Sequence, residues 1–238
     1  MKTDHEHYRR MARVLLILVI MAGFTAGCRT PLQGKKIEHA GFLGDYSKLH
    51  PGKSGQAQFI YRNPLADFAK YSKIMIDPIG AWAAPKSKLA ALPEKDVTAV
   101  LSYLDGALRR ELSKDYAIVN NPGPDVMRLR IALTEARGAK VVLNTLSSVI
   151  PIGLAVSILK LAATGTHSAV GEVNVEAELL DSQTGEQLGA AIDGRAGRKV
   201  IASGNFTKWG DVQDAFDFWA ERLRLRLEEL RRVDGSHT

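Results

Sequence analysis

The segment VMRLRIALTEA occupies residues 126–136 and alternates apolar and polar side chains over most of its length. Apolar residues stand at every second position from Met127 to Leu133, and Arg128 and Arg130 lie between them. Because successive side chains of a strand point to opposite faces of its sheet, this spacing predicts a strand with one buried and one solvated face. Such a strand is typical of an antiparallel sheet that packs one face on a core.

Residues 172–180 repeat the alternation, with valines at one set of positions and Glu172, Glu176 and Glu178 at the other. The turn sequence DSQTG follows and leads into a third segment with strand character at 186–192. If the arginine-bearing strand lies beside the glutamate-bearing strand, opposite charges meet on the solvated face and help to fix the register.

The remaining regular elements complete an α+β pattern. Short apolar runs at 72–77 and 116–119 predict two more strands, and apolar residues recur at helical spacing over 94–114 and 211–232. We expect a mostly antiparallel sheet of about five strands with the helices packed on one face. A chain of 238 residues accommodates one such domain, which we place at 66–235, after a Gly- and Pro-rich lead-in at 28–65.

The N-terminal 27 residues have the layout of a secretory signal peptide. Three arginines at positions 9, 10 and 13 precede an unbroken apolar run over 14–24, and small residues follow at 25–27. The run is too short for a membrane-spanning helix, which needs about 20 apolar residues. We therefore expect residues 1–27 to be removed during export.

Cys28 is the only cysteine of the chain and follows directly after Thr25-Ala26-Gly27. This arrangement resembles the bacterial lipobox, although Thr25 stands where the lipobox usually has leucine. The resemblance implies cleavage between Gly27 and Cys28 and acylation of Cys28, whose chains, palmitate among them, would hold the protein on a bilayer. Asp directly after the cysteine would resemble an inner-membrane retention signal. Because Arg29 stands at that position instead, the resemblance implies the outer membrane and a domain facing the periplasm. The alternative is an unmodified cysteine in an ordinary signal peptide.

A second apolar segment spans residues 141–163 and contains one charged residue, Lys160. Pro151 interrupts it, so two short helices in a hairpin fit better than one membrane span. Three outcomes remain open: a hairpin packed on its own sheet, a surface for a second copy or another envelope protein, or a segment that dips into a bilayer. The residues expected on the interaction surface are Leu146, Ile150, Leu154, Ile158 and Leu159.

No stretch of the sequence has the pattern of a catalytic, cofactor or metal site. The histidines lack the spacing of metal ligands, the chain has no Gly-x-Ser-x-Gly motif, and acylation would consume the only thiol. Glu172, Glu176 and Glu178 alternate on one strand and are expected to be solvated. The formal charge of +6 is mild, and a chain with an export signal is not expected to bind nucleic acid.

Several short motifs together resemble one family. They are GFLGDYSKL at 41–49, IDP at 76–78, EAELLD at 176–181 with TGE at 184–186, and FWA at 218–220. The chain is similar in these motifs to the bacterial lipoproteins of unknown function called DUF3313. The resemblance implies an envelope lipoprotein, with no established activity and no catalytic residues.

We therefore expect a lipid-anchored protein of the bacterial envelope that acts as a non-enzymatic interaction or scaffold module. Its partners would be the membrane, through the lipid, and a second copy or another envelope protein, through 141–163. The alternative is a binder of a small envelope ligand, a lipid or a glycan, in a cleft between the hairpin and the sheet. An enzyme would require a buried polar cluster, which sequence patterning does not reveal.

Overall fold

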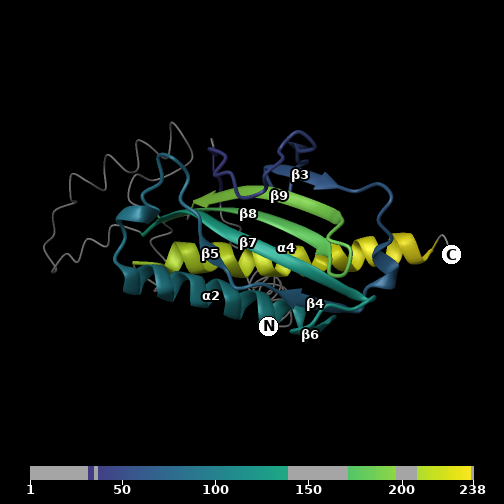
Figure 1. Cartoon of the computed structure of the whole chain (residues 1–238). Coiled ribbons are helices and arrows are strands. Elements are labelled where there is room, and N and C mark those ends of the chain that lie inside the picture. Colours follow the sequence, from purple (N-terminus) through teal and green to yellow (C-terminus); the bar gives the residue numbers. More distant parts are fainter. Residues whose placement is uncertain (1–31, 35–36, 139–170, 197–207, 237–238) are drawn as a thin grey trace, which may run out of the picture. The chain divides into compact units, whose positions relative to one another are not determined.

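The computed structural model describes residues 32–34, 37–138, 171–196 and 208–236, which all belong to the unit Pro31–Thr238 (Figure 1). These residues form one sheet and two long helices, α2 (Glu94–Leu112) and α4 (Gly210–Gly235). The predicted signal peptide, the Gly27/Cys28 cleavage and acylation site and the hairpin at 141–163 lie outside the described residues.

Three long antiparallel strands form the centre of the sheet: β7 (Val126–Arg137), β8 (Glu172–Asp181) and β9 (Gln187–Ala196). Shorter strands extend the sheet on both sides, in the order β2-β3-β9-β8-β7-β4-β6, while β1 pairs with β9 and β5 with β7. Their bounds are β1 Leu32–Gln33, β2 His50–Pro51, β3 Phe59–Arg62, β4 Lys73–Ile76, β5 Gly80–Ala81 and β6 Ala117–Val119.

The predicted fold class is wrong beyond its broad α+β description. The sheet has nine strands instead of about five, and it is mixed, because β4 pairs in parallel with β6 and β7, and β5 with β7. The parallel pairing follows from the connection: α2 lies between β4 and β6, and a helix-length crossover returns the chain to the same end of the sheet. The unpredicted strands are only two to four residues long, too short to show a period of two.

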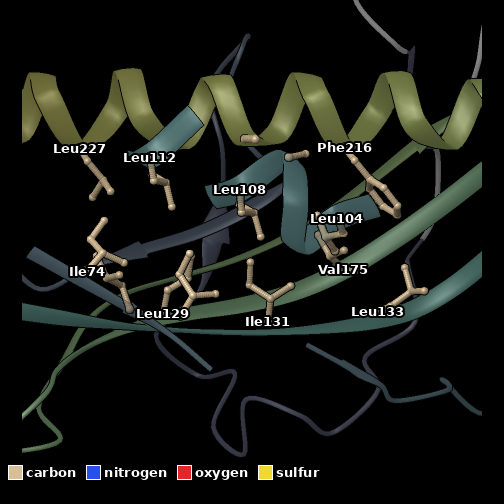
Figure 2. Packing of buried hydrophobic residues seen from close by; sticks show 14 of the residues in the cluster. Ile74, Leu104, Leu108, Leu112, Leu129, Ile131, Leu133, Val175, Phe216 and Leu227 are labelled. Atoms are coloured by element: carbon tan, nitrogen blue, oxygen red, sulfur yellow. The ribbon is translucent and has the colours of Figure 1, made fainter. Parts of the chain in front are cut away.

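The hydrophobic core lies between the sheet and the two helices. Figure 2 shows Leu104 and Leu108 of α2 and Phe216 of α4 pointing toward Leu129 and Ile131 of β7. All five side chains are buried. Burial of an aliphatic or aromatic side chain of this size contributes about 1.5–3 kcal/mol, so this layer accounts for the placement of both helices.

The part of the lead-in segment between β1 and β2 that contains Ala40, Phe42 and Tyr46 packs on the opposite face of the sheet. Glu176 neighbours the core residue Val175 along β8, so its side chain points away from the helices. Its carboxylate accepts hydrogen bonds from the backbone N–H of Ala40 and of Phe42 and from the hydroxyl of Tyr46. The motif at 41–49 therefore covers the middle of this face.

Candidate functional site

A cleft of about 380 Å³ opens between α4 and the side of the sheet formed by β8, β9 and β3. Among the sheet residues that line it, three have little or no side chain: Ala177 of β8, and Gly189 and Ala191 of β9. Ala177 pairs directly with Ala191 in the register of these strands. Large side chains at these positions would fill the space under α4, so the small residues create the cavity.

The wall of the cleft is apolar. From α4 come Leu223, Leu227 and Leu230, and from β3 comes Ile60, which pairs with Ala191. A cavity of this size with an apolar lining and a few polar groups at its margins matches the general character of small-molecule sites, whose volumes are about 300–1,000 Å³.

One margin of the cleft holds a buried charged pair. Asp193 and Arg195 of β9 are 3% and 6% exposed, and Arg195 Nε donates a 2.6 Å hydrogen bond to Asp193 Oδ2. The same oxygen accepts a bond from Trp219 Nε1 at 2.7 Å, and Oδ1 accepts from Gln33 Nε2 and from the Gln58 N–H. Because donors surround the carboxylate, it fixes Trp219 of α4 to the sheet and is not placed to act as a base.

The rim of the cleft carries exposed arginines of α4. Arg222 Nη2 donates to the carbonyl oxygen of Gly55 at 2.5 Å, and its guanidinium lies 5.8 Å from the centre of the Phe218 ring. Arg226 forms an ion pair with Glu229 at 2.6 Å. The rim therefore combines positive charge with an apolar interior.

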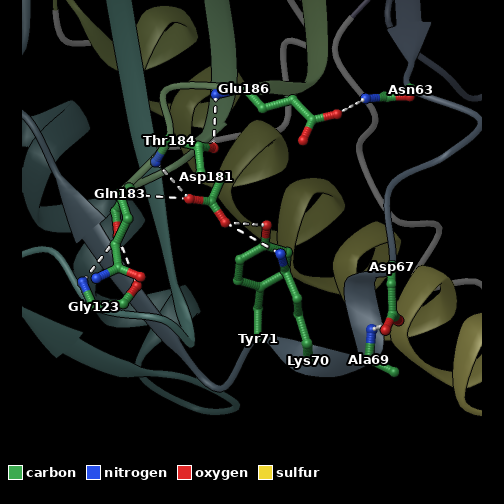
Figure 3. A network of polar contacts seen from close by, with 11 residues as sticks. Asn63, Asp67, Ala69, Lys70, Tyr71, Gly123, Asp181, Gln183, Thr184 and Glu186 are labelled. Atoms are coloured by element: carbon green, nitrogen blue, oxygen red, sulfur yellow. Dashed lines mark hydrogen bonds and ion pairs between the residues drawn. The ribbon is translucent and has the colours of Figure 1, made fainter.

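A second polar network lies where the β8–β9 turn meets the 3₁₀ helix η1 (Phe68–Lys70), as Figure 3 shows. Asp181 accepts hydrogen bonds from the N–H groups of Gln183 and Thr184, from Tyr71 Oη at 2.8 Å and from Lys70 Nζ at 3.2 Å. Burial alone would raise the pKa of Asp181, but the donors outweigh it and hold that pKa well below its usual value. The carboxylate stays ionised and closes the turn, which is a structural role.

The expectation that Glu172, Glu176 and Glu178 form a solvated row is wrong for two of them. Glu176 is completely buried, and Glu178 is 7% exposed, whereas Glu172 is partly exposed. Glu178 forms an ion pair with Arg130 across the β7–β8 pairing, so the predicted meeting of the arginine and glutamate strands is observed there.

The described residues contain no group of three or more His, Cys, Asp and Glu side chains that could hold a metal ion. Within the same residues, neither α2 nor α4 has a window apolar and long enough to span a bilayer.

The site residues predicted from sequence, which are Gly27, Cys28 and the five residues of the predicted interaction surface, lie outside the described residues. The cleft itself was missed. The available signal was the run Gly189-Ala190-Ala191, because small residues in a strand interior indicate a place where another group approaches closely.

No curated protein matches the chain. Among solved structures, the chain is similar to the PelC dodecamer from Paraburkholderia phytofirmans, with 15% identity, a TM-score of 0.37 and coverage of 69% of this chain and 94% of that one. Protein XCC0632 from Xanthomonas campestris has 12% identity and a TM-score of 0.38 over 74% of this chain and 94% of its own. A putative lipoprotein from Caulobacter crescentus has 12% identity and a TM-score of 0.31, over 72% and 95%.

The family comparison is specific. The model described as "Protein of unknown function (DUF3313)" matches residues 38–223, a range that begins in the lead-in segment and ends within α4. It includes the GFLGDYSKL motif that binds Glu176 and nearly all of the sheet. The family predicted from the short motifs is thereby confirmed, and the chain belongs to the DUF3313 family.

Proposed function

We propose that this protein is a lipid-anchored protein of the bacterial cell envelope whose folded domain is a non-enzymatic binding module for a small apolar or amphiphilic ligand. The observation that carries the binding role is the 380 Å³ cleft between α4 and the sheet. Binding of a small ligand is one of the two functions expected from the sequence. The sequence-based expectation was a site between the predicted hairpin and the sheet, whereas the proposed site lies between α4 and the sheet.

The physical support is the match between cavity and ligand class. An apolar molecule gains about 25 cal/mol for each Å² of apolar surface that it removes from water. The cleft offers aliphatic side chains from α4 and β3 and the small residues Ala177, Gly189 and Ala191, and its charged side chains include the mutually paired Asp193 and Arg195.

The non-enzymatic role is supported by the pairing of the polar groups at the cleft. Asp193, the buried carboxylate there, accepts hydrogen bonds from four donors and has no free lone pair directed at the cavity. A general base needs an accessible proton-accepting atom, and a nucleophile needs such a base beside it.

The binding role can be tested with phenylnaphthylamine, a dye that fluoresces in apolar sites, titrated against the purified domain. We expect saturable binding that weakens from the wild type to Ala191→Val and further to Ala191→Leu, since each added carbon occupies part of the cleft. The matched control is Ala83→Leu at an exposed position, which should bind as the wild type does. Equal binding by all four proteins, or none by the folded wild type, would contradict the proposal.

The anchoring role rests on the sequence around Cys28, and Arg29 after it supports the outer membrane as the location, with the domain facing the periplasm. Intact-mass measurement of the protein purified from membranes should show an N-terminus at Cys28 that carries acyl chains. Cys28→Ser should leave the signal peptide attached and the mass free of lipid. A wild-type protein with an unmodified cysteine in the soluble fraction would refute anchoring.

The sequence also favours a partner surface at 141–163, because that segment is apolar with a single charge at Lys160. Deletion of 141–163 should reduce the mass of any complex measured by light scattering, while dye binding in the cleft should persist. An unchanged mass would remove this second function without affecting the first.

A further inference from the structure

We infer that the ligand of the cleft is a medium-chain fatty acid, held by its alkyl chain under α4 and by its carboxylate at Arg222. This inference rests on the proposed binding function of the cleft and specifies the chemistry of its ligand.

The first step is the charge balance at the cleft. Four arginines line it, and three of them are paired with carboxylates of the chain. The pairs are Arg62 with Asp234 at 2.8 Å, Arg195 with Asp193 at 2.6 Å and Arg226 with Glu229 at 2.6 Å. Arg222 forms no ion pair with any carboxylate in the part of the chain that the structure describes.

Among the described residues, no carboxylate compensates the positive charge that Arg222 brings to the rim. A guanidinium has five N–H donors in a planar fork, and one of those of Arg222 is used on the Gly55 carbonyl oxygen. The others remain for an anion, and a carboxylate is the anion whose two oxygens and single charge fit one guanidinium. A phosphate monoester, with about −1.5 to −2 charge at neutral pH, would exceed this single charge.

The loop around Gly55 holds Arg222 in place at the rim. Gly55 has a φ of +83°, which favours glycine, and a Cβ at this position would lie 2.7 Å from Arg222 Nη2. Lys53 and Gln56 close the loop, since the Gln56 N–H donates to the Lys53 carbonyl oxygen at 2.9 Å. The guanidinium is thus fixed between this loop and the Phe218 ring before any ligand arrives.

The second step is the shape and size of the apolar space. At about 30 Å³ for each water-sized group, 380 Å³ holds roughly a dozen non-hydrogen atoms, which is one alkyl chain of medium length. Two acyl chains of a phospholipid would need about twice this volume. A glycan would leave its hydroxyl groups without partners against Leu223, Leu227 and Ile60, at a cost of about 1–3 kcal/mol for each buried group.

The test is competition against bound phenylnaphthylamine by four compounds with the same alkyl chain: laurate, lauryl alcohol, lauryl phosphate and lauryltrimethylammonium, each below its critical micelle concentration. With the wild type we expect laurate to compete about tenfold better than the alcohol, as a charge-assisted hydrogen bond of about 1.5 kcal/mol predicts. The cationic compound should compete least.

Arg222→Gln should abolish the advantage of laurate over the alcohol while the affinity for the uncharged dye stays the same. Arg222→Lys should keep part of the advantage, since the charge remains without the fork. The control is Arg109→Gln, which removes an arginine of α2 that does not line the cleft and is paired with Asp105, and should change the ratio less than twofold. Urea unfolding of each variant checks that the fold is intact.

The outcomes separate the two proposals. Equal competition by laurate and the alcohol, with normal dye binding, would overturn the assignment of the head group and leave the cleft as a binding site. Stronger competition by lauryl phosphate than by laurate would overturn the assignment to a carboxylate. A folded wild type that binds neither the dye nor laurate, the latter measured by calorimetry, would overturn the proposed function and this inference together.

Discussion

The hydroxyl of Tyr46 donates a 2.7 Å hydrogen bond to Oε2 of Glu176, a carboxylate that is completely buried in the middle of the sheet. The hydroxyl also accepts a 2.6 Å bond from the Gly41 N–H. Tyr46 thus joins the lead-in segment to β8 and closes a small network whose other members are the N–H groups of Ala40 and Phe42. A buried carboxylate with only donors around it holds the lead-in segment to the sheet through its charge.

Glu176→Gln should destabilise the domain by about 1–3 kcal/mol, because the amide nitrogen would face backbone donors that lose their acceptor. The side chain volume hardly changes, so packing does not contribute. Urea unfolding at neutral pH measures the difference in the free energy of unfolding.

Tyr46→Phe is the matched comparison for this network. It removes the hydrogen bond to Glu176 and the acceptor of the Gly41 N–H, which is exposed and can bond to water, and it leaves both backbone bonds to Glu176, so a smaller loss of about 1 kcal/mol is expected. A Gln variant as stable as the wild type would show that Glu176 does not hold the lead-in segment.

Stability should fall steeply at high pH, starting above the usual tyrosine pKa of 10.0. Burial, followed by the hydrogen bond to Glu176 and its negative charge, raises the pKa of Tyr46 to about 12. Burial, together with the bond to Asp181, also raises the pKa of Tyr71 to about 12. A raised folded-state pKa contributes stability that is complete below the unfolded-state pKa and is lost as the pH rises through the folded value.

The measurement is the free energy of unfolding at a series of pH values from 9 to about 12, with phenolate absorbance followed in parallel. Tyr46→Phe should make the decline shallower, since one of the tyrosines with a raised pKa is gone. A decline of the same slope in this variant would count against the role of Tyr46.

The long elements of the fold could be predicted from the sequence because each contains several repeats of its period. Helix α2 was expected at 94–114 and spans Glu94–Leu112, and β7 was expected at 126–136 and spans Val126–Arg137. The sequence also indicated that opposite charges would meet if the arginine-bearing and glutamate-bearing strands were neighbours, and Arg130 and Glu178 meet in this way.

The parts that could not be predicted depend on contacts between distant segments. Glu176 has the same place in the alternation as a solvated residue, and only the folding of the segment at 41–49 over it makes it a buried acceptor. The cleft depends in the same way on the position of α4 above Gly189 and Ala191. Alternation reports which face of a strand a residue occupies, but it does not report what covers that face.

Asp181→Asn should lower stability at neutral pH by about 1–3 kcal/mol, because the amide nitrogen would replace the oxygen that accepts from Tyr71 and Lys70. It should also reduce the acid sensitivity of the domain. The folded-state pKa of Asp181 lies below the usual aspartate value of 3.8, so its contribution is present above pH 3.8 and is lost as the pH falls further.

Unfolding curves between neutral pH and about pH 2 give both quantities. The control is Asp105→Asn, which removes a surface ion pair with Arg109 and should change stability by less than about 0.5 kcal/mol. If the free energy of unfolding depends on acidic pH equally in the wild type and in Asp181→Asn, the prediction is contradicted.

Gly52→Ala should damage the loop that brings Gly55 to Arg222. The added Cβ would lie 2.0 Å from the carbonyl oxygen of Ala57, a backbone atom that cannot move aside without breaking the 3.0 Å bond from the Gly52 N–H to Gln58. We expect the free energy of unfolding to fall by about 1–3 kcal/mol, as for other overpacked positions. We also expect the affinity for laurate to fall more than the affinity for the uncharged dye.

The counterpart is Gly80→Ala, where a Cβ would meet nothing within 4 Å and stability should stay the same or rise by less than about 1 kcal/mol. Urea unfolding and dye competition on both variants check this, and a Gly52 variant that retains wild-type stability and wild-type preference for laurate would show that the loop does not position Arg222.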